Sequence, residues 1–475
     1  MKKRILIAVA LVLLAAVGTA GVFAALWYRE QTETKNLRGS STVEFVTTEE
    51  PGEELRPERE VERVPWPMFG YDLARTKVAP DFEHRPPFRR LWGVETRDYI
   101  EFPPAVANGR VFVANQRGVF LAIRTRNGKV MWRKELGRCV ASGPAFSHGI
   151  VYLGFGTTKP CGRSENRAGQ SGGVIAVNAR TGKVHWRFDA APVESSPLVV
   201  GNLVYVGSWN ERVYALNRKS GSVRWAFNAG EEVNSSAAYD DNTIYIGGEE
   251  GTLFALNAWT GALRWRASSY SRFGRREQFY PTPVVAYGRV FAANVDGTVY
   301  AFGAKSGRLL WARTAGTYVY TSPAVWRNRV YVGSYDGKFS ALDAATGDIV
   351  WQWEAPGAIH GAPTIMAGLV YFSTTSSGVA TSKAQRFIKA GRRGSYALDA
   401  RTGKPVWELP NVGQYSPVVA DEAHVYLTGS TRVYGMLARN TARALRREER
   451  QERREREREE REREERSDAP EADGS

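Results

Sequence analysis

The stretch SPAVWRNRVYVGSYDGKFSALDAATGDIVW, residues 322–351, decides the fold of this 475-residue chain. Its first apolar run opens with Ser-Pro, and proline is tolerated at the start of a strand because no ladder hydrogen bond is lost there. Two further runs flank the Asp-Gly of a tight hairpin, Asp336-Gly337. A turn rich in Asp, Thr and Gly then leads to a last strand that ends at Trp351. The stretch therefore predicts four antiparallel strands in a row.

Related stretches recur along the chain with a spacing of about 40 residues, which is typical of propeller blades. The copies of the second half end at tryptophans: Trp132, Trp186, Trp225, Trp265, Trp311, Trp351 and Trp407. The copies of the first half begin near Pro103, Gly143, Ser196, Ser236, Thr282, Ser322, Ala362 and Ser416. Hairpins repeated in this way, with no helical period between them, are compatible with three folds: a sandwich, a barrel or a propeller.

The two ends of the repeat array decide between these folds. The eighth copy stops at Leu437 without a strand that ends in tryptophan, whereas an isolated strand, FRRLWGVET, stands ahead of the first copy at residues 88–96. If this strand completes the last sheet, the ring closes and leaves no open sheet edge for aggregation. We therefore expect an all-β fold over residues 65–438: an eight-bladed β-propeller of four-stranded antiparallel blades, closed by an N-terminal strand.

The repeat endings, of the form Ala-Leu-Asp-x-x-Thr-Gly-x-x-x-Trp, resemble those of the PQQ-like β-propeller repeat family. This quinoprotein alcohol dehydrogenase-like family includes pyrroloquinoline-quinone (PQQ)-dependent alcohol dehydrogenases and the β-barrel assembly lipoprotein of Gram-negative outer membranes. The opening WPMFGYD, residues 66–72, is similar to the segment that precedes the first blade in the same family. The resemblance implies that each repeat tryptophan docks against the next blade, which would bury its ring and give its N–H a partner.

The first residues predict the compartment. Residues 1–4 are a basic cytoplasmic tail, and the uncharged apolar run 5–27 is long enough to cross a hydrocarbon layer of roughly 30 Å as a transmembrane helix. The positive-inside rule then places the propeller on the extracytoplasmic side of the cell membrane, held by a single-pass signal anchor. A cleaved signal peptide is the alternative, with Gly18-Thr19-Ala20 as its cleavage site. The protein is exported in both cases, and the polar residues 28–64 predict a flexible stalk.

The segment that follows the propeller, residues 439–466, is almost wholly Arg and Glu. Pairs such as Glu449 and Arg453 lie four positions apart with Glu first, and each pair stabilises an isolated helix by about 0.2 to 0.5 kcal/mol. The segment has no apolar a and d positions after Leu445. The pattern thus indicates a single solvated, coiled-coil-like charged helix, followed by a disordered tail over residues 467–475.

The net charge indicates which partners the protein can bind, and the cysteine content indicates a disulfide. The formal net charge of +15 favours contact with anionic surfaces, such as lipid headgroups or anionic envelope polymers, and export argues against nucleic acid. The two cysteines of the chain, Cys139 and Cys161, predict one disulfide in an oxidising compartment. Two unrelated thiols are the alternative.

The usual ligand site of a propeller is its central funnel, which is lined by residues at the start of each inner strand. The residues at this position are Glu101, Ala141, Glu194, Asn234, Tyr280, Tyr320, His360 and Gln414. Except for Ala141, they are the candidates for binding a ligand or partner, and the alternative is a solvated channel mouth. Two basic loops are further candidates for binding a partner: one with Arg272, Arg275 and Arg276, and one with Lys389, Arg392 and Arg393.

These features favour a non-catalytic, membrane-anchored scaffold for envelope proteins or polymers, with no catalytic residue, metal or cofactor expected. One alternative is an oxidoreductase that holds PQQ and calcium in the funnel, and Glu194 and Asn234 are of the ligand types that the resemblance implies. Against it, the vicinal Cys-Cys of many such enzymes is absent, and the funnel positions include no Asp to act as a base. A sensor that binds a small molecule in the funnel is the second alternative.

Overall fold

The computed structural model describes residues 18–25, 36–47, 64–158, 161, 170–272, 275–376, 391–413 and 418–438. The predicted tail 1–4, charged helix 439–466 and C-terminal tail 467–475 lie outside the described residues. Of the predicted membrane segment, residues 18–25 are described and form a helix. Within the described ranges no helix is both long enough and apolar enough to cross a membrane, so the predicted transmembrane helix is not confirmed.

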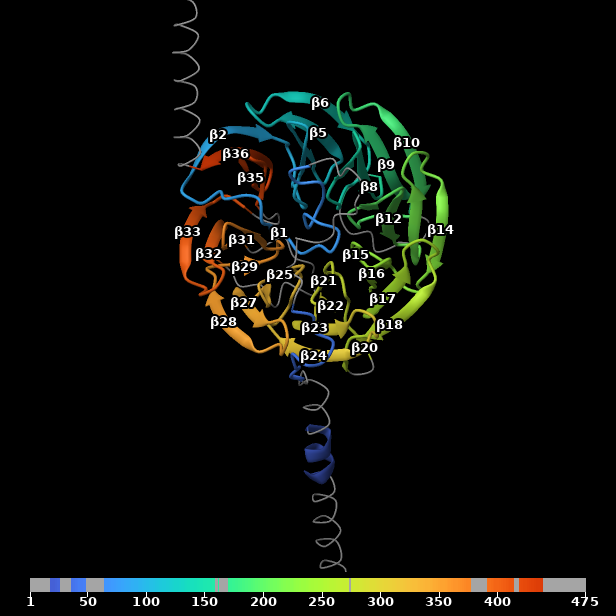
Figure 1. Cartoon of the computed structure of the whole chain (residues 1–475), viewed down its shortest axis with the longest axis vertical. Helices are drawn as coiled ribbons and strands as arrows, with labels where there is room; N and C mark the ends of the chain where they lie inside the picture. The colour runs from blue at the N-terminus through green and yellow to red at the C-terminus, as the bar shows by residue number, and fades with distance from the viewer. Residues whose placement is uncertain are drawn as a thin grey trace, which may run out of the picture.

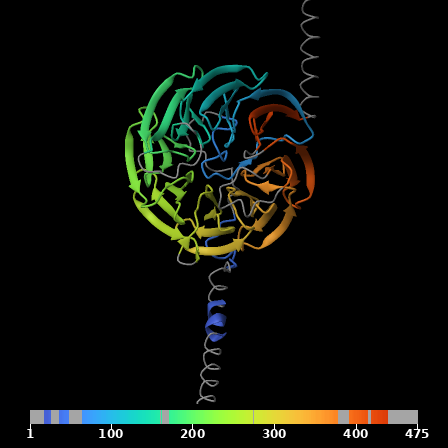
Figure 2. The ribbon, with the colours of Figure 1, turned by 180° about the vertical axis from the view of Figure 1, so that it is seen from behind.

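The described strands form a ring of antiparallel blades, each with its first strand near the centre and its last strand at the rim (Figures 1 and 2). Blade 1 consists of β3 (Ala105–Ala107), β4 (Arg110–Ala114), β5 (Val119–Arg124) and β6 (Val130–Glu135). Blade 2 consists of β7 (Ala145–Ser147), β8 (Ile150–Phe155), β9 (Gly172–Asn178) and β10 (Val184–Ala190). Blade 3 consists of β11 (Leu198–Val200), β12 (Leu203–Ser208), β13 (Arg212–Asn217) and β14 (Val223–Asn228). Blade 4 consists of β15 (Ala238–Asp240), β16 (Thr243–Gly247), β17 (Thr252–Asn257) and β18 (Leu263–Ser268).

The second half of the ring repeats this plan. Blade 5 consists of β21 (Val284–Ala286), β22 (Arg289–Ala293), β23 (Thr298–Gly303) and β24 (Leu309–Thr314), and a short hairpin of β19 (Ser271–Arg272) and β20 (Arg275–Arg276) precedes it. Blade 6 consists of β25 (Ala324–Trp326), β26 (Arg329–Gly333), β27 (Lys338–Asp343) and β28 (Ile349–Glu354). Blade 7 consists of β30 (Thr364–Met366), β31 (Leu369–Thr375), β32 (Gly394–Asp399) and β33 (Pro405–Pro410), with β1 (Val78–Ala79) and β29 (Ala358–Ile359) added. Blade 8 consists of β34 (Val419–Ala420), β35 (Val425–Thr428), β36 (Arg432–Ala438) and β2 (Phe88–Glu95).

Blade 8 joins the two ends of the repeat array. Strand β2 pairs antiparallel with β36, with Phe88 opposite Ala438 and Trp92 opposite Gly435. The pairing continues to Glu95 opposite Arg432, whose side chains form an ion pair. The N-terminal strand therefore supplies the rim of the last blade, which confirms the predicted eight-bladed ring and its closure.

The repeat tryptophans join each blade to the next one. The Nε1 of Trp311 on β24 donates a hydrogen bond to the Ala344 carbonyl of blade 6 at 3.0 Å. Its ring covers Gly347, where φ is +77° and a Cβ would lie 2.8 Å from the indole. The same arrangement is found for six other tryptophans, at donor distances of 2.7 to 3.2 Å: Trp92, Trp132, Trp186, Trp225, Trp265 and Trp351. The turn that contains this glycine is thus a docking site for the tryptophan of the neighbouring blade, as the resemblance implied.

The central strap, residues 64–84, crosses the middle of the ring (Figure 1). Its carbonyls accept hydrogen bonds from the inner strands of successive blades, from Phe146 of blade 2 at Pro67 to Ile365 of blade 7 at Lys77, at 2.7 and 2.8 Å. Leu73, Ala74 and Thr76 accept the equivalent bonds from blades 4, 5 and 6. The strap therefore pairs the inner edges that a propeller would otherwise leave open.

The docked segment, residues 36–47, lies on the rim of blades 5 and 6 beside β24. Leu37 pairs with Ala312, with N–H to carbonyl distances of 2.9 and 3.0 Å. The buried guanidinium of Arg289 donates to the carbonyls of Ser40, Val43 and Glu44 at 2.6 to 2.9 Å. Here the structure differs from the expected flexible stalk over residues 28–64, because main-chain hydrogen bonds hold these residues against the ring.

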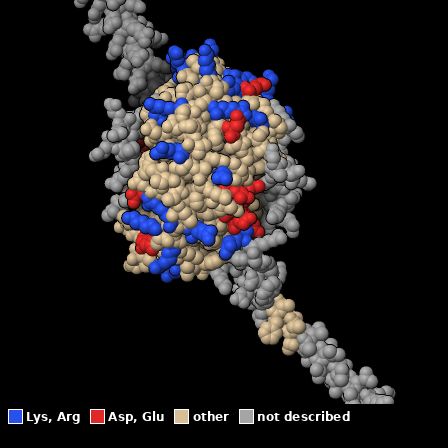
Figure 3. All heavy atoms as spheres, turned by 90° about the vertical axis from the view of Figure 1, so that its right-hand side faces the viewer, with Lys and Arg blue, Asp and Glu red and all other residues tan. Residues whose placement is uncertain are grey.

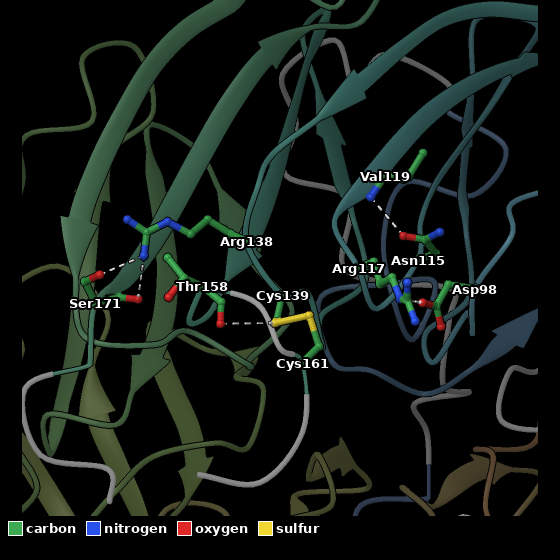
Figure 4. The surroundings of a disulfide bond; sticks show 9 residues. All are labelled: Asp98, Asn115, Arg117, Val119, Arg138, Cys139, Thr158, Cys161 and Ser171. Atoms are coloured by element: carbon green, nitrogen blue, oxygen red, sulfur yellow. Dashed lines mark hydrogen bonds and ion pairs between the residues drawn. A yellow bond between two sulfur atoms is a disulfide. The ribbon is translucent and has the colours of Figure 1, made fainter.

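A disulfide joins Cys139 to Cys161, as predicted, with 5.4 Å between the two Cα atoms (Figure 4). Cys139 lies between blades 1 and 2, and Cys161 lies in the loop that follows β8. On the other side of that loop, Arg138 donates to the hydroxyl of Ser171 at 2.7 Å (Figure 4). The loop is therefore held at both of its ends.

Replacing both cysteines with serine is expected to lower the free energy of unfolding by about 3 kcal/mol, because the bond closes a loop with a sequence separation of 22 residues in the unfolded chain. Denaturant unfolding of the Cys139→Ser, Cys161→Ser protein against the oxidised native chain measures this difference. A reductant should bring the native chain to the stability of the double variant and leave the variant unchanged. Equal stability of the oxidised native chain and the variant would contradict the expectation.

Candidate functional site

A pocket opens at the centre of the ring, where the chain enters the inner strands of blades 1 and 4 to 7. The space between its walls is about 490 Å³ when the solvent at its open mouth is counted. The lining residues are Phe69, Glu101, Phe102, Pro103, Asn234, Ser236, Tyr280, Pro281, Thr282, Tyr320, Ser322, His360, Gly361 and Ala362.

Five of the residues proposed for the funnel line this pocket together: Glu101, Asn234, Tyr280, Tyr320 and His360. Glu194 of blade 3 and Ala141 of blade 2 are not part of the lining, although Glu194 acts electrostatically on Tyr280. Gln414 of blade 8 lies outside the described residues. The repeat thus located most of the pocket, whereas Phe69 of the central strap was not expected.

On blades 4, 5 and 7, the first lining residue follows a fully buried apolar residue that packs on a glycine of the preceding blade. The side chains of Val233, Phe279 and Ile359 each lie 2.3 to 2.6 Å from where a Cβ on Gly207, Gly247 or Gly333 would stand. A side chain at these glycines would therefore push the blades apart. This contact holds Asn234, Tyr280 and His360, which come next in the chain, at the pocket.

Two serine hydroxyls in the lining of the pocket link neighbouring blades. The Oγ of Ser236 accepts a hydrogen bond from the N–H of Ser196 at 2.8 Å, and the Oγ of Ser322 accepts one from the N–H of Thr282 at 2.9 Å. The hydroxyl of Thr321 also bonds with both main-chain groups of Gly333, at 2.8 and 3.1 Å. Because Thr321 follows Tyr320, these bonds fix the place where the tyrosine enters the pocket.

One wall of the pocket is aromatic. The rings of Tyr280 and Tyr320 stack with centroids 4.2 Å apart, and His360 lies 4.9 Å from Tyr320. The hydroxyl of Tyr335 is hydrogen-bonded to His360 Nδ1, and Tyr318 stacks on Tyr320 at 6.2 Å. Neither Tyr318 nor Tyr335 was predicted. The signal lay in Tyr318-Val-Tyr320, where alternation places both tyrosines on the same side of the chain.

The lining also includes the carboxyl of Glu101 and the amide of Asn234. Burial raises the pKa of Glu101 to about 7. The pKa of the Tyr280 phenol is raised well above 10.0, first by burial and then by the negative charges of Glu194 and Glu101. Burial lowers the pKa of His360 to about 3. Near neutral pH the imidazole and the phenols are therefore uncharged, and Glu101 is the group whose charge changes.

This raised pKa makes stability depend on pH. An unfolded chain ionises Glu101 near pH 4.5, whereas the folded chain keeps the proton up to about pH 7. The contribution of Glu101 to the free energy of unfolding is therefore fully present below pH 4.5 and is lost as the pH rises to about 7. We expect Glu101→Gln, which keeps its neutral form, to gain melting temperature over the native chain at pH 8 but much less at pH 5. An equal difference at both pH values in thermal unfolding would contradict this.

The donor set of the pocket does not fit PQQ and calcium. The described residues contain no group of three or more His, Cys, Asp or Glu side chains that could hold a metal ion. Calcium in proteins takes six to eight oxygen ligands, several of them carboxylates. In addition, no Lys or Arg lines the described pocket to balance the carboxylates that PQQ carries. Glu194 and Asn234, the pair considered as calcium ligands, are separated by the boundary of the pocket.

No described residue of the two proposed basic loops lines the pocket. Arg272, Arg275 and Arg276 belong to the β19 and β20 hairpin, and Arg276 is exposed. The exposed Arg392 is held by a hydrogen bond from its N–H to the Pro356 carbonyl at 2.9 Å, with Arg393 next to it. Lys389 lies outside the described residues. The side of the ring in Figure 3 shows basic side chains interspersed with acidic ones rather than gathered in one patch.

Comparisons with known proteins give one family. The family model described as outer membrane protein assembly factor BamB matches residues 89–159, 166–324 and 295–469. The protein of that name from Moranella endobia is 29% identical over 231 residues, which are 46% of this chain and 59% of the relative, so the match spans less than two thirds of the relative's length.

Two solved structures show the same fold. BamB from Moraxella catarrhalis has a TM-score of 0.59 at 16% identity, over 74% of this chain and 100% of that one. A quinohemoprotein alcohol dehydrogenase from Pseudomonas putida has a TM-score of 0.62 at 14% identity, over 79% of this chain and 80% of that one. At these identities the likeness concerns the fold alone.

Proposed function

Because the chain belongs to the PQQ-like repeat family of the outer membrane protein assembly factor BamB, we propose that it is a non-catalytic scaffold for the assembly of envelope proteins. The observation that carries the proposal is the extent of the family match, which covers all eight blades. The donor set of the pocket, which does not suit a quinone with calcium, supports a scaffold over an oxidoreductase.

We propose further that the N-terminal segment holds the ring on the extracytoplasmic side of a membrane in a set orientation. If residues 5–27 span the bilayer, the chain between them and the docked segment reaches at most about 30 Å. Because the docked segment lies on blades 5 and 6, that part of the rim would face the membrane. A free stalk over residues 28–64 would set no such orientation.

The contacts of Arg289 are expected to hold the docked segment in place. In Arg289→Ala, five hydrogen bonds to carbonyls on the segment and on blade 6 are lost. Trypsin should then cut after Arg38, inside the segment, at least about tenfold faster, because the cut requires local opening. Arg308→Ala, an exposed arginine of the same blade, is the control and should leave the rate unchanged. An unchanged rate in Arg289→Ala would show that the segment is held by other contacts.

The scaffold proposal is tested on the full chain in its own membranes. A photoreactive amino acid at the exposed rim positions Val184, Val223 and Leu263 is expected to cross-link envelope assembly proteins from some positions and not from others. Cross-links that are equal at all positions, or absent, would count against a specific scaffold. The enzyme alternative is tested by reconstitution with PQQ and Ca²⁺, followed by dye reduction with alcohols. Turnover in this assay would favour an oxidoreductase and contradict the scaffold proposal.

A further inference from the structure

The amide of Asn234 presents an acceptor that the protein leaves without a donor. Asn234 lines the central pocket and is only 6% exposed. Its Nδ2 donates to Glu249 Oε1 at 3.0 Å, and because a carboxylate only accepts, the amide nitrogen must face Glu249. Its Oδ1 is consequently fixed on the other side, buried, with no hydrogen-bond partner among the described residues. Because buried polar groups are normally hydrogen-bonded, we expect this oxygen to accept a hydrogen bond from a bound molecule.

The charged groups around the pocket favour a cation. Glu101 is the ionisable carboxyl of the lining, and Glu194 and Glu249 act on Tyr280 from beyond it. The lining described above holds no lysine or arginine. Arg75 and Lys77 approach the ring of Phe69 within 6 Å, but neither of them lines the pocket, and their N–H groups donate to main-chain carbonyls. The pocket therefore presents acceptors and negative charge to a guest.

The aromatic wall suits the same guest. The stacked rings of Tyr280 and Tyr320 and the neutral imidazole of His360 offer electron-rich faces, toward which a cation is attracted. The two serine hydroxyls of the lining already take part in hydrogen bonds between blades, since Ser236 and Ser322 accept main-chain N–H groups. Asn234 and Glu101 are the polar lining groups that we expect to fix the orientation of a guest.

We propose that the central pocket binds a primary ammonium group, which donates hydrogen bonds to Asn234 Oδ1 and the Glu101 carboxylate and lies against the rings of Tyr280 and Tyr320. The ammonium group belongs either to a free small amine or to a lysine side chain of a peptide. This site goes beyond the scaffold function and stands whether or not that function holds.

Binding is expected to be coupled to the proton of Glu101. An ammonium group beside this carboxyl favours its charged form, so the guest lowers its pKa from about 7. Affinity should therefore fall as the solution is made more acidic than pH 7, and binding at pH 6 should release protons. The other titratable groups that face Glu101 across the pocket are Tyr280, Tyr320 and His360, and none of them changes charge between pH 6 and 8.

The experiment is calorimetric titration of the full chain at pH 8 with cadaverine and with Nα-acetyl-lysine N-methylamide. The neutral analogue of the second probe, Nα-acetyl-norleucine N-methylamide, should bind at least about tenfold more weakly, because it cannot donate to the buried oxygen. Binding of cadaverine alone would assign the site to free amines. Binding of the lysine amide as well would assign it to a lysine side chain.

Two pocket variants and two matched controls complete the test. Asn234→Leu and Glu101→Gln are each expected to weaken amine binding at least about tenfold, and Glu101→Gln should also abolish proton release at pH 6. Asn228→Leu, at the exposed end of β14, and Glu135→Gln, on the exposed rim strand β6, should bind as the native chain does. Thermal unfolding of each variant shows whether it is folded at the temperature of the titration.

Three results would overturn the proposal. The first is equal affinity for the lysine and norleucine amides, which would show that the pocket recognises the apolar part of the guest and not its ammonium group. The second is no heat with either amine at millimolar concentration, or tighter binding of a neutral sugar such as glucose. The third is unchanged amine binding in both Asn234→Leu and Glu101→Gln, which would place the amine elsewhere on the protein.

Discussion

Replacing Trp311 with alanine is expected to lower the free energy of unfolding by about 3 to 5 kcal/mol, the range for a large aromatic side chain in a core. Trp311 has an exposure of 0%, and its ring fills the space over Gly347 of the next blade. The substitution leaves a cavity between blades 5 and 6 and removes one of the two side-chain donors to the Ala344 carbonyl, which keeps its hydrogen bond from Arg289. Denaturant unfolding of Trp311→Ala against the native chain measures the loss.

Trp351 is the matched control for this prediction, because it holds the same place on the next blade. It donates to the Ala400 carbonyl at 3.2 Å, but it is only partly buried. The difference arises from the docked segment, since a Cβ on Gly39 would lie 2.7 Å from the Trp311 ring. We therefore expect Trp351→Ala to cost less than Trp311→Ala, and the two costs to approach each other in a chain that lacks residues 1–47. A larger loss in Trp351→Ala would show that the docked segment does not deepen the burial of Trp311.

The ring could be predicted because its parts repeat. Strand boundaries, the docking of tryptophans such as Trp225 on the next Thr-Gly turn and the closure at Trp92 all follow from a pattern with a constant register. Equivalent positions in successive copies meet at the same radius of the ring, so the funnel residues of blades 4 to 7 could be named from one copy. The disulfide was predictable for a different reason, because Cys139 and Cys161 are the two cysteines of the chain.

The parts that were not predicted do not repeat. The central strap has no period, because its main chain bonds to one blade after another: Leu73 meets Tyr239 of blade 4, and Lys77 meets Ile365 of blade 7. Its apolar residues, such as Phe69, resemble those of any loop in sequence. The docked segment shows a similar lack of pattern, and its place is determined by Arg289, far away in the chain. Contacts made once, between distant segments, carry no signal in a single sequence.

Arg75 in the central strap is expected to be the most costly charged residue to remove. Its guanidinium is fully buried and donates to the carbonyls of Ala237 at 2.8 Å, of Ser196 and Pro197 at 3.3 Å, and of Phe69. These acceptors belong to the strap and to blades 3 and 4. Arg75→Ala leaves them without donors in the centre of the ring, for an expected loss of about 3 to 5 kcal/mol in the free energy of unfolding.

Lys77→Met tests whether the loss of stability in Arg75→Ala comes from its lost hydrogen bonds or would follow from removing any buried cation. Burial lowers the pKa of Lys77 well below 10.5, so its ammonium form is held at a cost, and it donates a single hydrogen bond, to the Arg75 carbonyl at 2.9 Å. A methionine of similar length fills the same space without that cost, and its net effect on stability is expected to be under about 1 kcal/mol. If Arg75 acts by joining the strap to two blades, Arg75→Met should be nearly as costly as Arg75→Ala, because packing is kept and only the donors are lost. Chemical unfolding of the three variants measures these differences in the free energy of unfolding. An Arg75→Met protein as stable as the native chain would show that the ring does not need the hydrogen bonds of the Arg75 guanidinium.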